Sequence, residues 1–175
     1  FVVEEACENL PGVSASQIEM NANIQFYDGM TTKDIQNVLV RSANDLINLE
    51  TPNYQYAAAR LLLYDVRKEA HGQYEYMPLA KLIERNTKLG VYDKDIMEKY
   101  SKTECKKFNS WIRRERDLKF TYAGLRQVVD KYLVQDRSTG QLYETPQDMY
   151  MMIAATLFAD YPEKIRMSYV KKYYD

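Results

Sequence analysis

The chain has little of what metal sites and disulfide-stabilised folds require. Among its 175 residues there is one histidine, His71, and there are two cysteines, Cys7 and Cys105, far apart and in no Cys-x-x-Cys setting. A multi-histidine metal site cannot be built from one histidine, and structural zinc needs about four ligands of this kind. We therefore expect no metal site and no disulfide framework, with both thiols reduced. His71 is expected to be a surface residue near the end of a helix.

Charge of one sign and long apolar runs are also missing. The 24 basic and 25 acidic residues give a net charge of -1, so the whole chain has no electrostatic attraction to nucleic acid or membrane. No apolar run approaches the roughly 18 residues of a membrane span. We expect a cytoplasmic protein that binds neither nucleic acid nor membrane. A Gly-x-Gly-x-x-Gly or Walker A pattern is absent, so any nucleotide site is neither a Rossmann fold nor a P-loop.

Most of the chain carries helix signals. Five Ser or Thr residues stand where a helix is expected to begin, three in a capping pattern and two, Thr51 and Thr145, before a proline. They are Ser14 with Gln17, Thr31 with Asp34, Ser101 with Glu104, Thr145 with Asp148, and Thr51 before Pro52. Gly72 and Gly90 follow two predicted helices, where a left-handed C-cap favours glycine.

The period changes in the second half of the chain. Segments 131–135 and 141–144 flank the glycine-containing loop 136–140, which predicts a β-hairpin at about 131–144. The helical pattern also breaks near residue 73, where we place a boundary. The prediction is a mainly α fold: a helical bundle at 1–72, then a helical domain at 73–175 with one β-hairpin.

Two further stretches favour ordinary structural roles. The segment 111–117 mixes charges of both signs, which predicts a solvated helix face. Met149, Met151 and Met152 are expected to fill gaps in the core rather than form a partner groove.

Thr32 and Lys68 are candidate phosphate contacts. Thr32 stands at the start of a predicted helix, directly after the Asp28-Gly29 turn, where free N–H groups and the helix dipole favour an anion. On residues alone, the alternative is that Thr31 caps the helix and Thr32 is a solvated neighbour. Lys68 lies near the C-terminus of another predicted helix, where the alternative is a surface cation that compensates the dipole.

Several motifs together carry a resemblance to a known family. The first two are Ile24-Gln25-Phe26-Tyr27-Asp28-Gly29-Met30-Thr31-Thr32-Lys33-Asp34-Ile35, and Asn53-Tyr54-Gln55-Tyr56 with Arg67-Lys68 downstream. Later matches follow in the same order: Gly72-Gln73-Tyr74-Glu75, Gly90-Val91-Tyr92-Asp93, Phe120-Thr121-Tyr122-Ala123 and Thr139-Gly140-Gln141-Leu142-Tyr143-Glu144. Over its whole length the chain resembles the start of the large (alpha) subunit of class I ribonucleotide reductase. That region holds an ATP-cone domain and the helical region before the catalytic barrel.

The resemblance implies an allosteric nucleotide site and no catalytic residues in this segment. Thr32 and Lys68 fall where the family holds the triphosphate of ATP or dATP, with a magnesium ion. Ile35 is placed to line the pocket, or alternatively to be an ordinary core residue. Gln36 and Tyr64 fall near the adenosine pocket, although both differ in type from the relatives. Glu5 replaces a tryptophan that some relatives associate with a second nucleotide.

The resemblance also implies the activity of the complete enzyme. It would reduce ribonucleoside diphosphates to deoxyribonucleotides for DNA replication by a radical mechanism. The implied partners are the remainder of the alpha subunit, the small radical-generating beta subunit and a thioredoxin or glutaredoxin-type reductant, with the alpha subunit as a homodimer. Compared with the family, the chain begins after the basic β-hairpin of the cone and ends before the barrel cysteines. A truncated ATP cone at 1–72 and an inactive isolated segment are therefore expected.

Three alternatives remain open at this point. The chain could be a non-catalytic helical interaction module whose similarity reflects helix patterning. It could belong to the cone-bearing transcriptional repressors, although no paired Cys-x-x-Cys is present for their zinc ribbon. It could also be a degenerate cone that no longer binds nucleotide.

Overall fold

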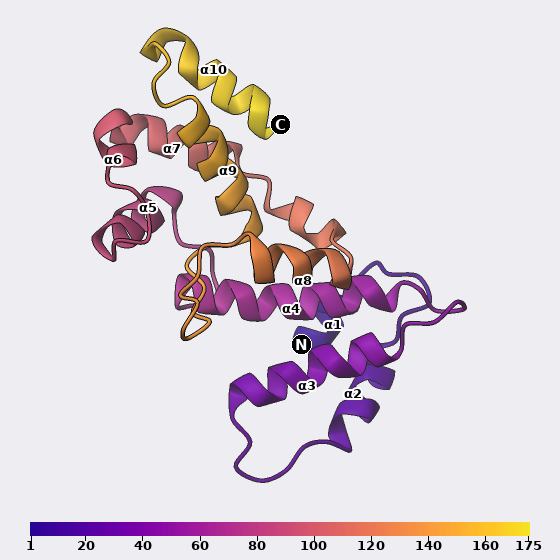
Figure 1. The fold of residues 1–175 in the computed structure, drawn as a ribbon. Helices are drawn as coiled ribbons and strands as arrows, with labels where there is room; N and C mark the ends of the chain where they lie inside the picture. Colours follow the sequence, from indigo (N-terminus) through magenta and orange to yellow (C-terminus); the bar gives the residue numbers. More distant parts are fainter. The chain divides into compact units, whose positions relative to one another are not determined.

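The computed structural model describes all 175 residues and is mainly helical, as predicted (Figure 1). Its elements are α1 (Val2–Cys7), α2 (Ala15–Asn23), α3 (Thr32–Asp45), α4 (Tyr54–His71), α5 (Leu79–Lys88), α6 (Asp95–Lys99), α7 (Lys102–Trp111), the 3-10 helix η1 (Arg114–Lys119), α8 (Tyr122–Lys131), α9 (Pro146–Leu157) and α10 (Glu163–Tyr174). Strand pairing is limited to one antiparallel bridge, between Gln135 and Leu142. None of the helices has the length and apolar composition needed to cross a bilayer.

The chain forms two compact units. The first contains Phe1–Val66 and Glu115–Tyr132, and the second contains Arg67–Arg114 and Leu133–Asp175. The division between Val66 and Arg67 falls within α4, so this helix contributes residues to both units.

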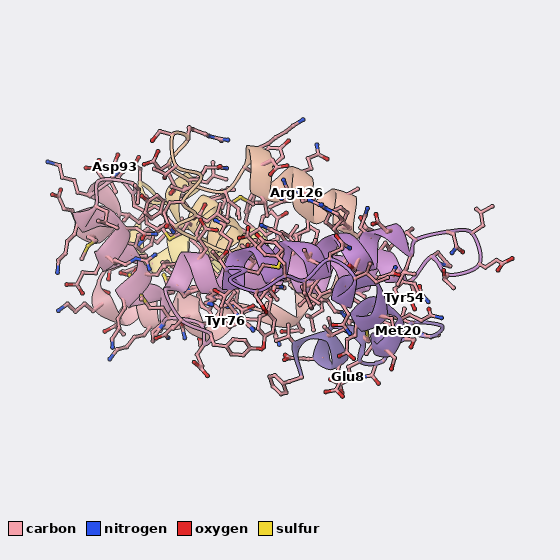
Figure 2. The ribbon with its side chains drawn as sticks, turned by 90° about the horizontal axis from the view of Figure 1, so that it is seen from below. Glu8, Met20, Tyr54, Tyr76, Asp93 and Arg126 are labelled. Atoms are coloured by element: carbon pink, nitrogen blue, oxygen red, sulfur yellow. The ribbon has the colours of Figure 1, made fainter.

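In the first unit, α2 packs against α1 and α3, and the phenol of Tyr54 ties the start of α2 to α4. Tyr54 is buried at the first turn of α4 (Figure 2). Its hydroxyl accepts a hydrogen bond from the Ser14 N–H at 3.0 Å and donates one to Gln17 Oε1 at 2.6 Å. The predicted capping box of Ser14 and Gln17 was therefore wrong. Ser14 is still the N-cap of α2, but the Tyr54 hydroxyl is hydrogen-bonded to the Ser14 N–H and to the Gln17 side chain, which the box would have joined to each other.

Three other predicted helix starts are confirmed. Thr31 accepts a hydrogen bond from the Asp34 N–H, and complete capping boxes begin α7 at Ser101 and α9 at Thr145. The start predicted at Thr51-Pro52 was early, because α4 begins at Tyr54. The Thr51 N–H donates instead to Asn48 Oδ1 at 2.9 Å, which holds these residues in a turn before the helix.

In the second unit, α10 packs against α7 and α9, and α5 packs against α7. The core includes Leu79, Leu82, Phe108 and Val170. The three methionines predicted to lie in the core, at positions 149, 151 and 152, are all buried. Tyr100 and Phe108 pack edge to face with ring centroids 5.0 Å apart.

The interpretation of segment 111–117 as one solvated helix face was wrong. Helix α7 ends at Trp111, the backbone is extended at Ile112, and the 3-10 helix η1 follows. Asp117 is only 1% exposed. Arg114, itself partly buried, makes an ion pair with the fully buried Asp148 of the same unit, so at least this charge has a structural partner.

The β-hairpin is shorter than the predicted range 131–144. Lys131 is the last residue of α8, so the two segments pair only from Val134 onward. The Tyr143 N–H donates to the Val134 carbonyl at 3.0 Å, and the Asp136 N–H donates to the Gln141 carbonyl at 2.9 Å. The loop turns at Gly140, whose φ of 79° lies in the left-handed region.

Candidate functional site

The N-terminus of α3 has the form predicted for it. Gly29 turns the chain with a φ of 86°, and Thr31 follows as an extended N-cap. The Thr31 hydroxyl accepts from the Asp34 N–H at 3.1 Å and donates to Asp34 Oδ2 at 2.6 Å. Thr32 is then the first helical residue and is exposed. A helix has no carbonyl for the N–H of this position, so both the N–H and the hydroxyl of Thr32 suit an anionic ligand.

One turn further along α3, Gln36 reaches α4. Its side-chain Nε2 donates to the Leu61 carbonyl at 2.7 Å, one turn before Tyr64 on the same helix. The Tyr64 hydroxyl donates to Glu5 Oε2 at 3.4 Å. Ile35, the residue before Gln36, is half-buried. This degree of burial suits either a core or a pocket-lining role. The structure thus brings Gln36 to the part of α4 that carries Tyr64.

Lys68 lies in the last turn of α4 and is exposed. It follows Tyr64 by one helical turn and belongs to the second compact unit. Its sequence neighbours have partners outside the helix. The Arg67 guanidinium stacks on Tyr74 at 4.4 Å from the ring centroid. On the other side, the Leu142 N–H donates to Glu69 Oε1 at 3.3 Å.

His71, predicted to be a surface residue, is only 3% exposed, so that prediction was wrong. Its Nδ1 accepts a hydrogen bond from the Met77 N–H at 3.2 Å, and its Nε2 lies 3.3 Å from Asp148 Oδ2. Nδ1 thus acts as the acceptor of the His71 ring, and Nε2 faces the Asp148 carboxylate. Its ring also packs edge to face with Tyr76, whose position is labelled in Figure 2.

Asp148, at the start of α9, accepts three hydrogen bonds from Arg114 and Thr145 and also lies next to His71. Arg114 Nη2 donates to its Oδ1 at 2.6 Å, and Oδ2 accepts from the Thr145 N–H at 3.1 Å and the Thr145 hydroxyl at 2.6 Å, besides facing His71. Burial acts to raise the pKa of Asp148, but the hydrogen bonds from His71 and Arg114 and the Arg114 charge hold the pKa well below its usual range. Asp148 is therefore ionised.

Glu144, two residues after Leu142 of the bridge, is a different kind of buried carboxyl. It accepts hydrogen bonds from the Val134 N–H at 2.9 Å and from the Tyr92 hydroxyl, and it is 1% exposed. Burial raises its pKa to about 7, against the opposing effect of these hydrogen bonds. Burial and the Glu144 charge also raise the pKa of Tyr92 well above its usual range.

Sequence reasoning missed the role of the residues around Lys68. The helix start at Thr145 and Asp148 was predicted, but the second role of Asp148 as the partner of Arg114 and His71 was not. The separations of 34 and 77 residues carry no local periodicity that would connect them.

Comparison with known families places two domains on this chain. Residues 2–69 match the family described as ATP cone domain, and residues 118–175 match the family described as ribonucleotide reductase, all-alpha domain. The class that these matches define is a chain with an ATP cone domain followed by a ribonucleotide reductase all-alpha domain.

The relatives make the family more specific. The chain is 44% identical over 99% of its length to ribonucleoside-diphosphate reductase 1 subunit alpha of Salmonella typhimurium and 43% identical over 99% to that of Escherichia coli. It is 39% identical over 99% to ribonucleoside-diphosphate reductase subunit alpha of Haemophilus influenzae. The chain spans 23% of the length of each of these relatives. Over nearly its whole length the chain is similar to the N-terminal segment of ribonucleotide reductase alpha subunits, which confirms the resemblance found in the sequence.

Proposed function

We propose that this chain is the regulatory and scaffolding part of a ribonucleoside-diphosphate reductase alpha subunit. The observation that carries the proposal is the order of the two matches, an ATP cone at 2–69 followed by the reductase all-alpha domain at 118–175. Residues 1–72 act as the nucleotide-sensing domain, and residues 73–175 form the helical domain that follows it. An interaction module with chance helix patterning would not account for both matches, nor for 44% identity over 99% of the chain.

Within the cone, we propose that Thr32 and Lys68 contact the phosphates of ATP or dATP, with a magnesium ion. Thr32 presents a helix N-terminus and an exposed hydroxyl, and Lys68 presents an exposed ammonium group. Both chemistries suit a polyphosphate. Asp34 adds a carboxylate to the same first turn as Thr32, where it would repel a phosphate unless a cation screened it. A bound magnesium ion would supply that screening.

Ile35, Gln36 and Tyr64 are the proposed contacts of the nucleoside. Gln36 is already anchored to the Leu61 carbonyl, so its position relative to α4 is set before a ligand binds. A preorganised amide loses less conformational freedom on binding than a mobile one.

The complete subunit would reduce ribonucleoside diphosphates in the cytoplasm as a homodimer, with a small beta subunit that generates the radical and a thioredoxin or glutaredoxin-type reductant. Effector control is then a linked equilibrium. A nucleotide shifts the enzyme toward an inhibited assembly only if it binds that assembly more tightly than the active one.

Lys68→Ala in the complete alpha subunit tests the proposed site. We expect basal ribonucleotide reduction to be nearly unchanged, because an exposed lysine at a helix end contributes little to folding. The dATP concentration for half-inhibition should rise about tenfold to a hundredfold, which corresponds to the roughly 1.5–3 kcal/mol of one charge-assisted hydrogen bond. Thr32→Ala should act in the same direction but more weakly, because a neutral hydroxyl is lost.

The matched control is Lys172→Ala, which removes another exposed lysine from the last turn of a helix, α10. This variant should retain the parent's dATP titration. If Lys68→Ala also retains it, Lys68 is an ordinary surface cation and the proposed site is wrong. If no variant or parent responds to dATP, the cone has lost nucleotide binding.

A further inference from the structure

We propose that the last turn of α4 is a latch that couples nucleotide binding at Lys68 to the packing of α9 and of the hairpin that begins at Val134. This inference rests on the proposed function, because it takes Lys68 as a phosphate contact. The latch is defined as Glu69 and His71 of α4 together with Gln141, Asp148 and Arg114. It makes His71 and Asp148 positioning residues for the effector site, without contact to the nucleotide.

The first half of the latch joins α4 to the hairpin. Gln141 Nε2 donates to the Glu69 carbonyl at 3.1 Å, and the Leu142 N–H donates to Glu69 Oε1 at 3.3 Å. Leu142 is itself one side of the antiparallel bridge. A single residue next to Lys68 is thus bonded through both its main chain and its side chain to the hairpin.

The second half joins α4 to the start of α9. His71 Nε2 lies 3.3 Å from Asp148 Oδ2, and Arg114 donates to the other carboxylate oxygen. Both the histidine and the aspartate side chains are completely buried, so water cannot substitute for either partner. Tyr76 contacts both of these partners of Asp148: the Arg114 guanidinium lies 4.2 Å from the centroid of its ring, and the His71 ring packs against it.

Lys68 is the exposed member of a turn whose neighbours are held. Glu69 and His71, one and three residues later, are fixed by the hairpin and by α9, and Gly72 ends the helix with a φ of 69°. The backbone of Lys68 therefore moves only if this turn moves against its partners. A ligand that requires one position of the Lys68 ammonium selects the latched arrangement, and by linkage the latched arrangement must favour the ligand.

The test compares ATP binding by calorimetry, in the presence of magnesium, for the complete alpha subunit and its variants. His71→Phe and Asp148→Asn open the second half of the latch and should each weaken ATP binding at least about fivefold, the lower range of measured allosteric coupling. The matched control is Glu104→Gln, which breaks the buried ion pair between α7 and α10 in the same unit without touching α4. It should destabilise the fold while leaving ATP affinity within about twofold of the parent.

A second readout follows the reverse direction of the coupling. Saturating ATP should slow amide hydrogen exchange at Met77 and Leu142, whose N–H groups donate to His71 and Glu69, and should fail to do so in Lys68→Ala. If His71→Phe does not fold, Gln141→Ala provides a milder variant. It removes one side-chain bond of the latch and should also weaken the ATP-dependent protection.

The outcomes separate this inference from the function on which it rests. If Lys68→Ala weakens ATP binding but the latch variants bind as the parent does and ATP leaves both amides unchanged, the latch is refuted and the effector site stands. If Lys68→Ala itself changes nothing, or the parent binds no ATP, the effector site is refuted and the latch is refuted with it.

Discussion

Glu144 predicts a pH dependence of stability with an unusual sign. A carboxyl whose pKa is raised in the folded protein holds its proton more tightly there than in the unfolded chain. Stability from this group is therefore fully present below pH 4.5, falls as the pH rises to about 7, and is constant above that value. The contribution runs opposite to that of Asp148, whose lowered pKa stabilises the fold at neutral pH and is lost only in acid.

The size of the effect follows from the same two values. The gap between the ordinary pKa of 4.5 and the folded value of about 7 corresponds to about 3 kcal/mol, at roughly 1.36 kcal/mol per pH unit. Glu144→Gln removes the titration and resembles the protonated acid. Its amide oxygen can accept from the Val134 N–H, and its amide nitrogen can donate to the Tyr92 oxygen. Relative to the parent, this variant should gain about 3 kcal/mol between pH 4.5 and pH 8.

Urea unfolding followed by the fluorescence of Trp111, the single tryptophan, measures this difference at several pH values. Glu104→Gln serves as the control. Burial acts to raise the pKa of Glu104, but hydrogen bonds from Ser101 and Arg166 lower it overall, so the control difference should stay constant between pH 5 and pH 8. Parallel pH profiles for the parent and Glu144→Gln would refute the reasoning, because Glu144 would then titrate alike in both states.

Three further changes have expected outcomes. Asp148→Ala should destabilise the chain by about 3–5 kcal/mol in urea unfolding, since it leaves Arg114 partly buried without its carboxylate; a loss under about 1 kcal/mol would contradict this. Tyr54→Phe should cost about 1 kcal/mol in the same assay, because the Ser14 N–H loses its acceptor, and an unchanged midpoint would show that water replaces the phenol. Burial raises the pKa of the Cys7 thiol to about 11, so alkylation by iodoacetamide at pH 8 should be slower than for a free thiol; equal rates would exclude this environment.

The features predictable from sequence were those decided within one helical turn. The caps at Thr31, Ser101 and Thr145 need only a hydroxyl and a backbone N–H three residues later, so their sequence spacing is sufficient. The same spacing failed at Ser14 because Tyr54, forty residues away, offers a competing hydroxyl. A local pattern predicts where a helix begins more reliably than which partner completes its cap.

Burial of polar residues was the part that could not be predicted. A lone histidine at a helix end and a stretch of mixed charge both fit a solvated surface, yet His71 and Asp117 are buried. Burial becomes favourable only when partners satisfy each polar group. For His71 these partners are Met77 and Asp148, and the second comes from a different helix. The residues proposed for the effector site came from the family resemblance, since exposed Thr32 and Lys68 are locally unremarkable.

The double use of Asp148 has a consequence for how this chain can vary. Asn and Ser often replace Asp at helix starts with little effect, because capping needs only an acceptor. Here the carboxylate also neutralises Arg114 and faces His71. A neutral replacement would keep the cap but would leave the Arg114 guanidinium without its carboxylate. Such a substitution would be tolerated only together with changes at both partners. Position 148 should therefore covary with positions 71 and 114 among close relatives of this chain. An alignment of these relatives should show substitutions at the three positions together.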